Sequence, residues 1–164
     1  MARSRPKGGA GLIAVFIENE AGSDIKHHYD EATFEVIETE RVGAEYPYPY
    51  GFVPGTLAPD GDAVDCFVLT SRELRSGTTI HCEPLALLEQ TEGGEVDHNI
   101  LAVPQGDPAP NLLAAQEIIG SFLDKFMAGV AERRAVMGRL LPVDDAITYL
   151  ADHRTAKPPR PSQP

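Results

Sequence analysis

Three aspartates, Asp60, Asp62 and Asp65, lie close together in a short segment of the chain. Negative charges at this spacing repel one another, so the segment is destabilised unless a positive charge lies among them. A hard divalent cation held by carboxylate oxygens is the usual partner of such a group. A plain turn is the alternative interpretation, because Asp side chains bond the local backbone and Gly61 accepts a positive φ. An EF-hand loop does not fit, since its twelfth position falls on Ser71 and not on a glutamate.

A segment rich in tyrosine and proline precedes these aspartates, and an apolar run follows them. Residues 46–53 read YPYPYGFV, and residues 66–69 read CFVL. Such an aromatic string could be a ligand for a peptide-binding module, but it runs directly into the acidic cluster. The two segments together resemble the family I (soluble) inorganic pyrophosphatases, whose signature joins a Tyr-Pro-x-x-Tyr-Gly strand to a DxDxxD cluster. Ala63 departs mildly from that pattern, and weaker similarity extends over residues 17–126.

The resemblance implies hydrolysis of inorganic diphosphate to two phosphates by direct attack of metal-activated water, with Mg²⁺ or another divalent ion such as Mn²⁺ as cofactor. It also implies a role for each residue that matches the family. The residues implied as metal ligands are Glu18, Asp60, Asp65, Glu92 and Asp97. The residues implied as catalytic are Asp62, which orients or deprotonates the water, and Tyr50, which lies beside the nucleophile. The residues implied as substrate-binding are Lys26 and Arg41.

The chain departs from the family pattern mainly where cations should hold phosphate oxygens. Asn99 replaces a lysine, and Phe126 and Met127 replace a Tyr-Lys pair. His28 replaces an acidic residue, and imidazole suits Mn²⁺ better than Mg²⁺. The expected metal side is therefore nearly complete, while the expected phosphate side has lost positive charge.

Three interpretations of this imbalance stay open. The protein still cleaves diphosphate, with Lys125, Arg133 or Arg134 as substitute cations. Alternatively, it is a divergent phosphohydrolase acting on an organic phosphate or phosphoanhydride, whose apolar end Phe126 and Met127 would suit. The third possibility is a catalytically degenerate homologue that binds metal or subunits. The acidic cluster argues against the third, because carboxylates with no cation to hold would only repel one another.

Composition limits the partners and the location. The chain has 164 residues, which predicts one domain, and its formal net charge of −11 argues against nucleic acid as a partner. An acidic protein attracts an anionic substrate only if bound metal ions reverse the local charge. Cys66 and Cys82 form no CxxC motif, and no apolar segment is long enough to span a membrane, so we expect a cytoplasmic protein without a membrane partner. The family resemblance implies a homo-oligomer, specifically a hexamer.

Many short strands followed by two helices predict an α+β fold, and the resemblance makes this a five-stranded OB-like closed β-barrel flanked by two helices. The expected extended segments are residues 11–18, 25–29, 34–41, 46–53, 65–70, 79–88 and 99–103. A helix begins after Asn111 as N-cap and keeps apolar spacing to Phe126, and a second helix covers residues 144–153. The domain is expected over residues 11–154, between a disordered tail at 1–10 and a Pro-rich disordered tail at 155–164.

Overall fold

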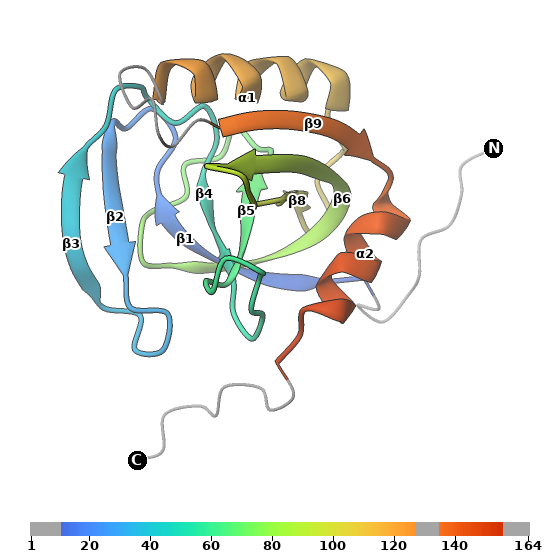
Figure 1. The fold of residues 1–164 in the computed structure, drawn as a ribbon, viewed down its shortest axis with the longest axis horizontal. Helices are drawn as coiled ribbons and strands as arrows, with labels where there is room; N and C mark the ends of the chain where they lie inside the picture. Colours follow the sequence, from blue (N-terminus) through green and yellow to red (C-terminus); the bar gives the residue numbers. More distant parts are fainter. Residues whose placement is uncertain (1–10, 127–134, 156–164) are drawn as a thin grey trace.

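A closed barrel of five strands forms the centre of the protein in the computed structural model, which describes residues 11–126 and 135–155. Around the barrel the strands follow the order β1, β4, β5, β8 and β6, and β6 pairs again with β1 (Figure 1). The pairing of β5 with β8 is parallel, while the other pairings are antiparallel. The α+β fold with a five-stranded closed barrel is therefore confirmed. The barrel strands are β1 (Ile13–Asn19), β4 (Tyr50–Val53), β5 (Val64–Val68), β6 (Thr79–Glu92) and β8 (Asn99–Pro104).

Two further strands pair with the long strand β6. They are β7 (Glu95–Val96) and β9 (Ala135–Leu141). Strand β6 continues beyond its predicted end at residue 88, and β9 lies between the two helices, where no strand was predicted, so both predictions were wrong. The last residues of β6 are polar, so no apolar alternation marked the extension, and their partner β9 lies mostly at the surface.

A separate two-stranded ribbon lies beside the barrel (Figure 1, left). It consists of β2 (Ile25–Tyr29) and β3 (Val36–Arg41), paired antiparallel. Lys26 is opposite Glu40, and His28 is opposite Glu38, so these four side chains share one face of the ribbon. Every residue of β3 is exposed, so this strand buries no apolar face against the barrel. Contacts of residues elsewhere in the ribbon therefore hold it in place.

The two helices cover the barrel by their apolar faces. Helix α1 (Leu112–Phe126) begins as predicted, because Asn111 Oδ1 accepts the Ala114 N–H at 3.0 Å. Its buried residues pack with Tyr46 and Phe67 of the barrel side. Helix α2 (Val143–Asp152) buries Ala146 and Leu150 against the barrel interior. The helical spacing read from the sequence therefore identified the face of α1 that is buried.

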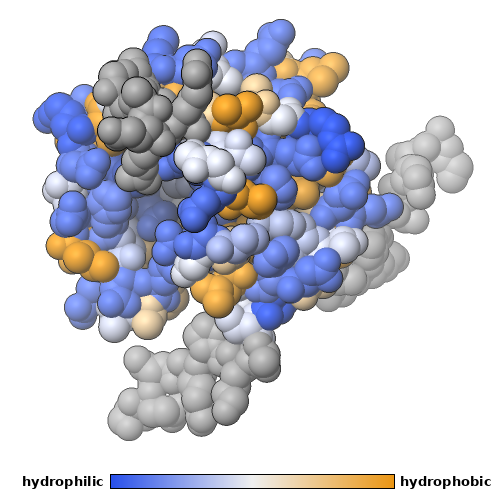
Figure 2. Space-filling model, in the orientation of Figure 1, coloured by the Kyte–Doolittle hydropathy of each residue, from blue (hydrophilic) through white to orange (hydrophobic). Residues whose placement is uncertain are grey.

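Figure 2 shows a face of the molecule on which hydrophilic side chains predominate and apolar side chains form small separate groups. Within residues 11–126 and 135–155, no helix is long and apolar enough to cross a membrane. The predicted tail at 1–10 and nearly all of the predicted tail at 155–164 lie outside the described residues. The same is true of Met127, Arg133 and Arg134.

Candidate active site

The loop between β4 and β5 is a hydrogen-bonded turn that presents Asp60 and Asp62. The Asp62 N–H donates to Asp60 Oδ1 at 3.0 Å, and the Ala58 N–H donates to the Asp62 carbonyl at 2.7 Å. Gly61 supplies the positive φ of 92° that this turn requires. The Asp62 residue is exposed, although burial and the charge of Asp60 still raise the pKa of its carboxyl. The turn therefore holds a carboxylate with raised proton affinity where a substrate in solution can reach it.

Asp65 and Asp97 form a close carboxyl pair beside this loop. Asp65 lies in β5, between Phe52 of β4 and Asn99 of β8 in the strand register, while Asp97 precedes β8. Burial raises the pKa of Asp65 well above its usual range, and repulsion by Asp97 raises it further. Burial likewise raises the pKa of Asp97, and the two carboxyl groups share a hydrogen bond. Ionisation of either carboxyl group therefore makes ionisation of the other less favourable.

Tyr50, in the adjacent strand β4, contacts this carboxyl pair. Its hydroxyl donates a hydrogen bond to Asp65, which partly offsets the upward shift of that carboxyl. The ring packs between Tyr46 and Phe67, with centroid distances of 5.6 and 4.8 Å. Burial and the charge of Asp65 raise the pKa of the Tyr50 hydroxyl well above 10, so it acts as a donor and not as a base.

Glu18, near the end of β1, belongs to the same group of acids. Burial is the largest cause that raises its pKa from 4.5 to about 8, and repulsion by Glu31 is the second. Lys26 lowers the pKa of Glu18, Asp62 and Asp97, so this one ammonium acts on three separate parts of the group. The structure thus brings Lys26 to the acids, and the substrate-binding role expected for it stays a prediction.

A small cavity of about 50 Å³ opens beside the acids. Polar residues line one side of it and aromatic and apolar residues line the other. The polar residues are Lys26, Gln90, Glu92, Asp97 and Asn99; the others are Tyr46, Tyr50, Phe67, Phe122, Leu123 and Phe126. The Lys26 ammonium lies 5.5 Å from the centre of the Phe126 ring, a cation–π contact. Phe126, which stands where the family resemblance leads one to expect a tyrosine, therefore contacts Lys26.

Arg41 is not among the residues that the structure brings to the acids. Its guanidinium binds both carboxylate oxygens of Asp24 at 2.9 and 2.8 Å, and its side chain is 72% exposed. Since Lys26 and Glu40 point to one face of the ribbon, Arg41 beside Glu40 points to the other. The substrate-binding role expected for Arg41 would therefore require the side chain to leave Asp24.

A chain of amide hydrogen bonds orients Asp97, and the sequence analysis did not identify it. Asn99 Nδ2 donates to Gln90 Oε1 at 2.9 Å, and Gln90 Nε2 donates to Asp97 Oδ2 at 3.3 Å. Both amide side chains are buried. Asn99, which stands where the resemblance leads one to expect a lysine, thus helps to orient Asp97 through Gln90 without adding charge. This network could be predicted only if Gln90 were known to point inward. The last residues of β6 are all polar, so the sequence gives no sign that Gln90 is buried.

A second group of potential ligands lies on the ribbon. His28, Glu38 and Glu40 bring their ligand atoms within 4.8 Å of one another, and His28 Nε2 is 3.4 Å from Glu40 Oε1. Both glutamates are exposed.

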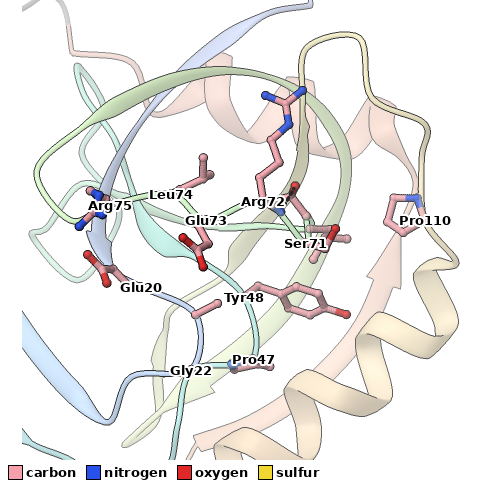
Figure 3. A pocket seen from close by; sticks show the side chains of 13 residues that line it. Glu20, Gly22, Pro47, Tyr48, Ser71, Arg72, Glu73, Leu74, Arg75 and Pro110 are labelled. Atoms are coloured by element: carbon pink, nitrogen blue, oxygen red, sulfur yellow. Dashed lines mark hydrogen bonds between the residues drawn. The ribbon is translucent and has the colours of Figure 1, made fainter.

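A separate cavity of about 730 Å³ is lined by Arg72, Arg75, Tyr48 and Glu20, among other residues (Figure 3). None of the predicted site residues lines that cavity.

The donor set beside Lys26 fits a hard divalent cation. Its ligand atoms are carboxylate oxygens, which Mg²⁺ and Mn²⁺ prefer. Burial raises the pKa of Glu18, Asp65 and Asp97, so a positive charge nearby would stabilise their ionised forms. A bound cation would offset the repulsion among these oxygens and favour their ionised forms. The residues that could supply the oxygens are Glu18, Asp60, Asp65, Glu92 and Asp97.

These pKa shifts predict an unusual pH dependence of stability in the absence of metal. A carboxyl whose pKa is higher in the folded state binds its proton more tightly there, so its stabilising effect is complete below about pH 4.5 and is lost as the pH rises. For Glu18 the loss extends through about pH 8, and Asp62, Asp65 and Asp97 shift in the same direction. We expect the free energy of unfolding in EDTA to fall from about pH 5 to 8 in urea titrations. A Glu18→Gln variant should show a smaller fall, and stability that rises over this range would contradict the assignment.

The sequence matches the family model described as inorganic pyrophosphatase over residues 15–127. An inorganic pyrophosphatase of Synechocystis is 42% identical over 108 residues, and the match covers 64% of this chain and 62% of the relative. An inorganic pyrophosphatase of Sulfolobus acidocaldarius is 35% identical over 121 residues, covering 72% of this chain and 69% of the relative. Matches to the first curated relatives thus span about three fifths of their length.

Solved structures of inorganic pyrophosphatases share the fold. The structure from Thermus thermophilus has a TM-score of 0.76 at 24% identity and covers 90% of this chain and 93% of its own. The structure from Coxiella burnetii has a TM-score of 0.78 at 24% identity, covering 89% and 95%. The barrel and both helices therefore correspond to a known architecture over most of the chain.

Proposed function

Because the chain belongs to the inorganic pyrophosphatase family, we propose that it hydrolyses inorganic diphosphate to two phosphates with divalent cations as cofactor. The observation that carries this proposal is the convergence of separate elements on one acidic site. Tyr50 donates a hydrogen bond to Asp65 of the buried carboxyl pair. Lys26 interacts with the charges of Asp97, of Glu18 and of the exposed Asp62 in the hydrogen-bonded turn. Hydrolysis of a phosphoanhydride needs these parts, because it depends on charge neutralisation and on a positioned water.

When bound, divalent cations would supply positive charge to the substrate oxygens and lower the pKa of the attacking water. Asp62 then accepts the proton of that water as its oxygen forms a bond to phosphorus. The bridging P–O bond breaks, and the second phosphate leaves with the bridging oxygen. Tyr50 holds Asp65 through its hydrogen bond, and Gln90 holds Asp97. Lys26, beside the acids, binds a phosphate oxygen of the substrate.

A second candidate function is supported by the lining of the cavity. Phe122, Leu123 and Phe126 form an apolar wall next to Lys26. An organic phosphate or phosphoanhydride with an apolar leaving group would contact such a wall, whereas inorganic diphosphate would not. A nucleoside diphosphate and an aryl phosphate are therefore the comparison substrates for any assay.

The test is phosphate release by purified protein from inorganic diphosphate, first with Mg²⁺ and then with Mn²⁺. An Asp62→Ala variant in the same assay shows whether the release comes from this site. Metal-dependent release that the variant lacks would support the proposal. Release from the organic substrates alone would favour the second candidate, and no release from any substrate would reject both.

The two cationic residues are expected to differ in their effect on substrate binding. Lys26→Ala should lower kcat/KM for diphosphate by about 10- to 100-fold, because a hydrogen bond to a charged group contributes roughly 1.5–3 kcal/mol. Arg41→Ala should change it by less than about fivefold, since it removes only an exposed ion pair with Asp24. Steady-state kinetics of both variants check this. An Arg41 effect as large as that of Lys26 would show that the guanidinium leaves Asp24 to bind substrate.

The remaining parts of the proposal concern the metal, the location and the assembly. Mg²⁺ is the proposed cofactor, and Mn²⁺ is the proposed alternative because His28 lies on the same ribbon face as Lys26. We propose a cytoplasmic location on account of Cys66 and Cys82, which are free thiols that a reducing compartment preserves. A homo-oligomer, with the hexamer as the expected form, is proposed from the family alone.

A further inference from the structure

Glu31, in the turn between β2 and β3, differs in burial from the residues that follow it. Residues 32–41, which complete the turn and form β3, are all exposed, whereas Glu31 is partly buried. Its Oε1 accepts the backbone N–H of Ala63 at 3.0 Å. Ala63 directly follows Asp62, so the contact joins the tip of the ribbon to the acidic loop across 32 residues of sequence. A glutamate at a hairpin tip therefore reaches the proposed catalytic loop.

The ribbon turn is built to hold Glu31 at this place. Asp30 Oδ1 accepts the N–H groups of Ala32 and Thr33 at 2.8 and 3.0 Å, which closes the turn. Phe34 has a φ of 62°, a left-handed conformation that is uncommon for a phenylalanine. This conformation lets its ring stack on Phe16 at a centroid distance of 4.8 Å. The turn is thus docked on the barrel by a residue in a costly conformation, and such conformations are often found at functional sites.

The charges around Glu31 are negative. Asp62, Asp60 and Asp30 all repel it, and it in turn repels Glu18 more than any other charge does. Its hydrogen bond to Ala63 engages one of its two carboxylate oxygens. A structural tie could be made by an uncharged side chain, since Gln or Asn accepts the same N–H. Placing a further negative charge here destabilises the metal-free protein and is useful only if a cation is bound.

We propose that Glu31 belongs to the cation-binding carboxylates of the site, where its charge strengthens the binding of a divalent ion beside Glu18 and the Asp60–Asp62 turn. This inference rests on the proposed function and adds a residue that neither the acidic motif nor the Tyr-Pro strand indicated. Position 28, where the family resemblance leads one to expect an acid, holds a histidine in this chain. Glu31 restores a carboxylate from the same ribbon, three residues further along.

The test is Mn²⁺ binding to the full chain without substrate, followed by the electron paramagnetic resonance signal of free Mn²⁺. Glu31→Gln keeps the size of the side chain and an oxygen that accepts the Ala63 N–H, so it removes the charge alone. Its Kd for Mn²⁺ should rise about tenfold, the size of effect common for supporting residues of metal sites. Glu35→Gln is the matched control, because Glu35 lies on the same ribbon and is exposed; its Kd should match that of the wild type.

Thermal unfolding in EDTA separates loss of charge from loss of fold. Glu31→Gln should be at least as stable as the wild type there, because it removes a repelling charge, and Mn²⁺ should raise its Tm less. Wild-type Mn²⁺ affinity in Glu31→Gln, equal weakening in Glu35→Gln, or no Mn²⁺ binding by the wild type would overturn the proposal. Diphosphate hydrolysis is measured in parallel. If the wild type cleaves diphosphate and Glu31→Gln binds Mn²⁺ as tightly as the wild type, only the role of Glu31 is rejected. If Glu31→Gln binds Mn²⁺ more weakly but the wild type cleaves no diphosphate, only the proposed function is rejected.

Discussion

Asp62→Asn is expected to reduce kcat for diphosphate by about 10²- to 10⁴-fold, the range typical for loss of a general acid–base group. The amide has the shape of the carboxyl but cannot accept the proton of the attacking water. The turn that carries Asp62 uses its backbone N–H and carbonyl, and both remain in the variant. The activity should therefore fall while the free energy of unfolding in urea stays within about 0.5 kcal/mol of the wild type.

Asp152→Asn is the control for this substitution, because Asp152 is exposed at the end of α2 and is not one of the acids of the site. Its kcat should equal that of the wild type. An Asp62→Asn enzyme within tenfold of the wild-type rate would remove the assignment of Asp62 as the proton acceptor.

Gly51→Ala is expected to destabilise the protein by about 4 kcal/mol or more, which is exceptional for one methyl group. A Cβ at Gly51 would lie 1.7 Å from the carbonyl oxygen of Phe16 and 2.8 Å from its carbonyl carbon. Both are backbone atoms of the paired strand β1, so no side-chain rotation relieves the clash. To relieve the clash, β4 would have to move away from β1. This movement would also displace Tyr50, the adjacent residue, from Asp65 and so lower activity.

Urea titration measures this loss, and Gly11→Ala serves as its control. A Cβ at Gly11 meets no atom within 4 Å, so that variant should unfold within about 1 kcal/mol of the wild type. If Gly51→Ala unfolded at the same urea concentration as the wild type, the close approach of β1 and β4 would be wrong.

The elements were predictable from sequence where a local pattern determined them. The ribbon strand at residues 25–29 and the N-cap Asn111 were predicted as they are, because alternation and capping are local. The strand β9 was missed, since its stability comes from pairing with β6 and not from its own pattern. The end of β6 was placed too early for the same reason. Contacts between distant segments determine these elements, and a pattern within one segment does not record them.

In the candidate site, too, local sequence patterns predicted some residues, while others depend on contacts between distant segments. The acidic motif placed Asp60, Asp62 and Asp65 correctly in one loop and strand, and the roles of these residues stay predictions. Arg41 illustrates the limit, because the alternation of β3 directs it to Asp24 and away from the acids. Glu31 could not be identified from sequence, since only the docking of the ribbon turn places it beside Ala63.

The most direct test of the central claim follows inorganic diphosphate by ³¹P nuclear magnetic resonance in H₂¹⁸O with Mg²⁺. We expect the diphosphate signal to be replaced by two phosphates for each diphosphate, and early in the reaction half of the phosphate should carry one ¹⁸O. Excess EDTA should abolish the change. A diphosphate signal that persists with Mg²⁺ and with Mn²⁺ would contradict the proposal that this acidic site is a diphosphatase.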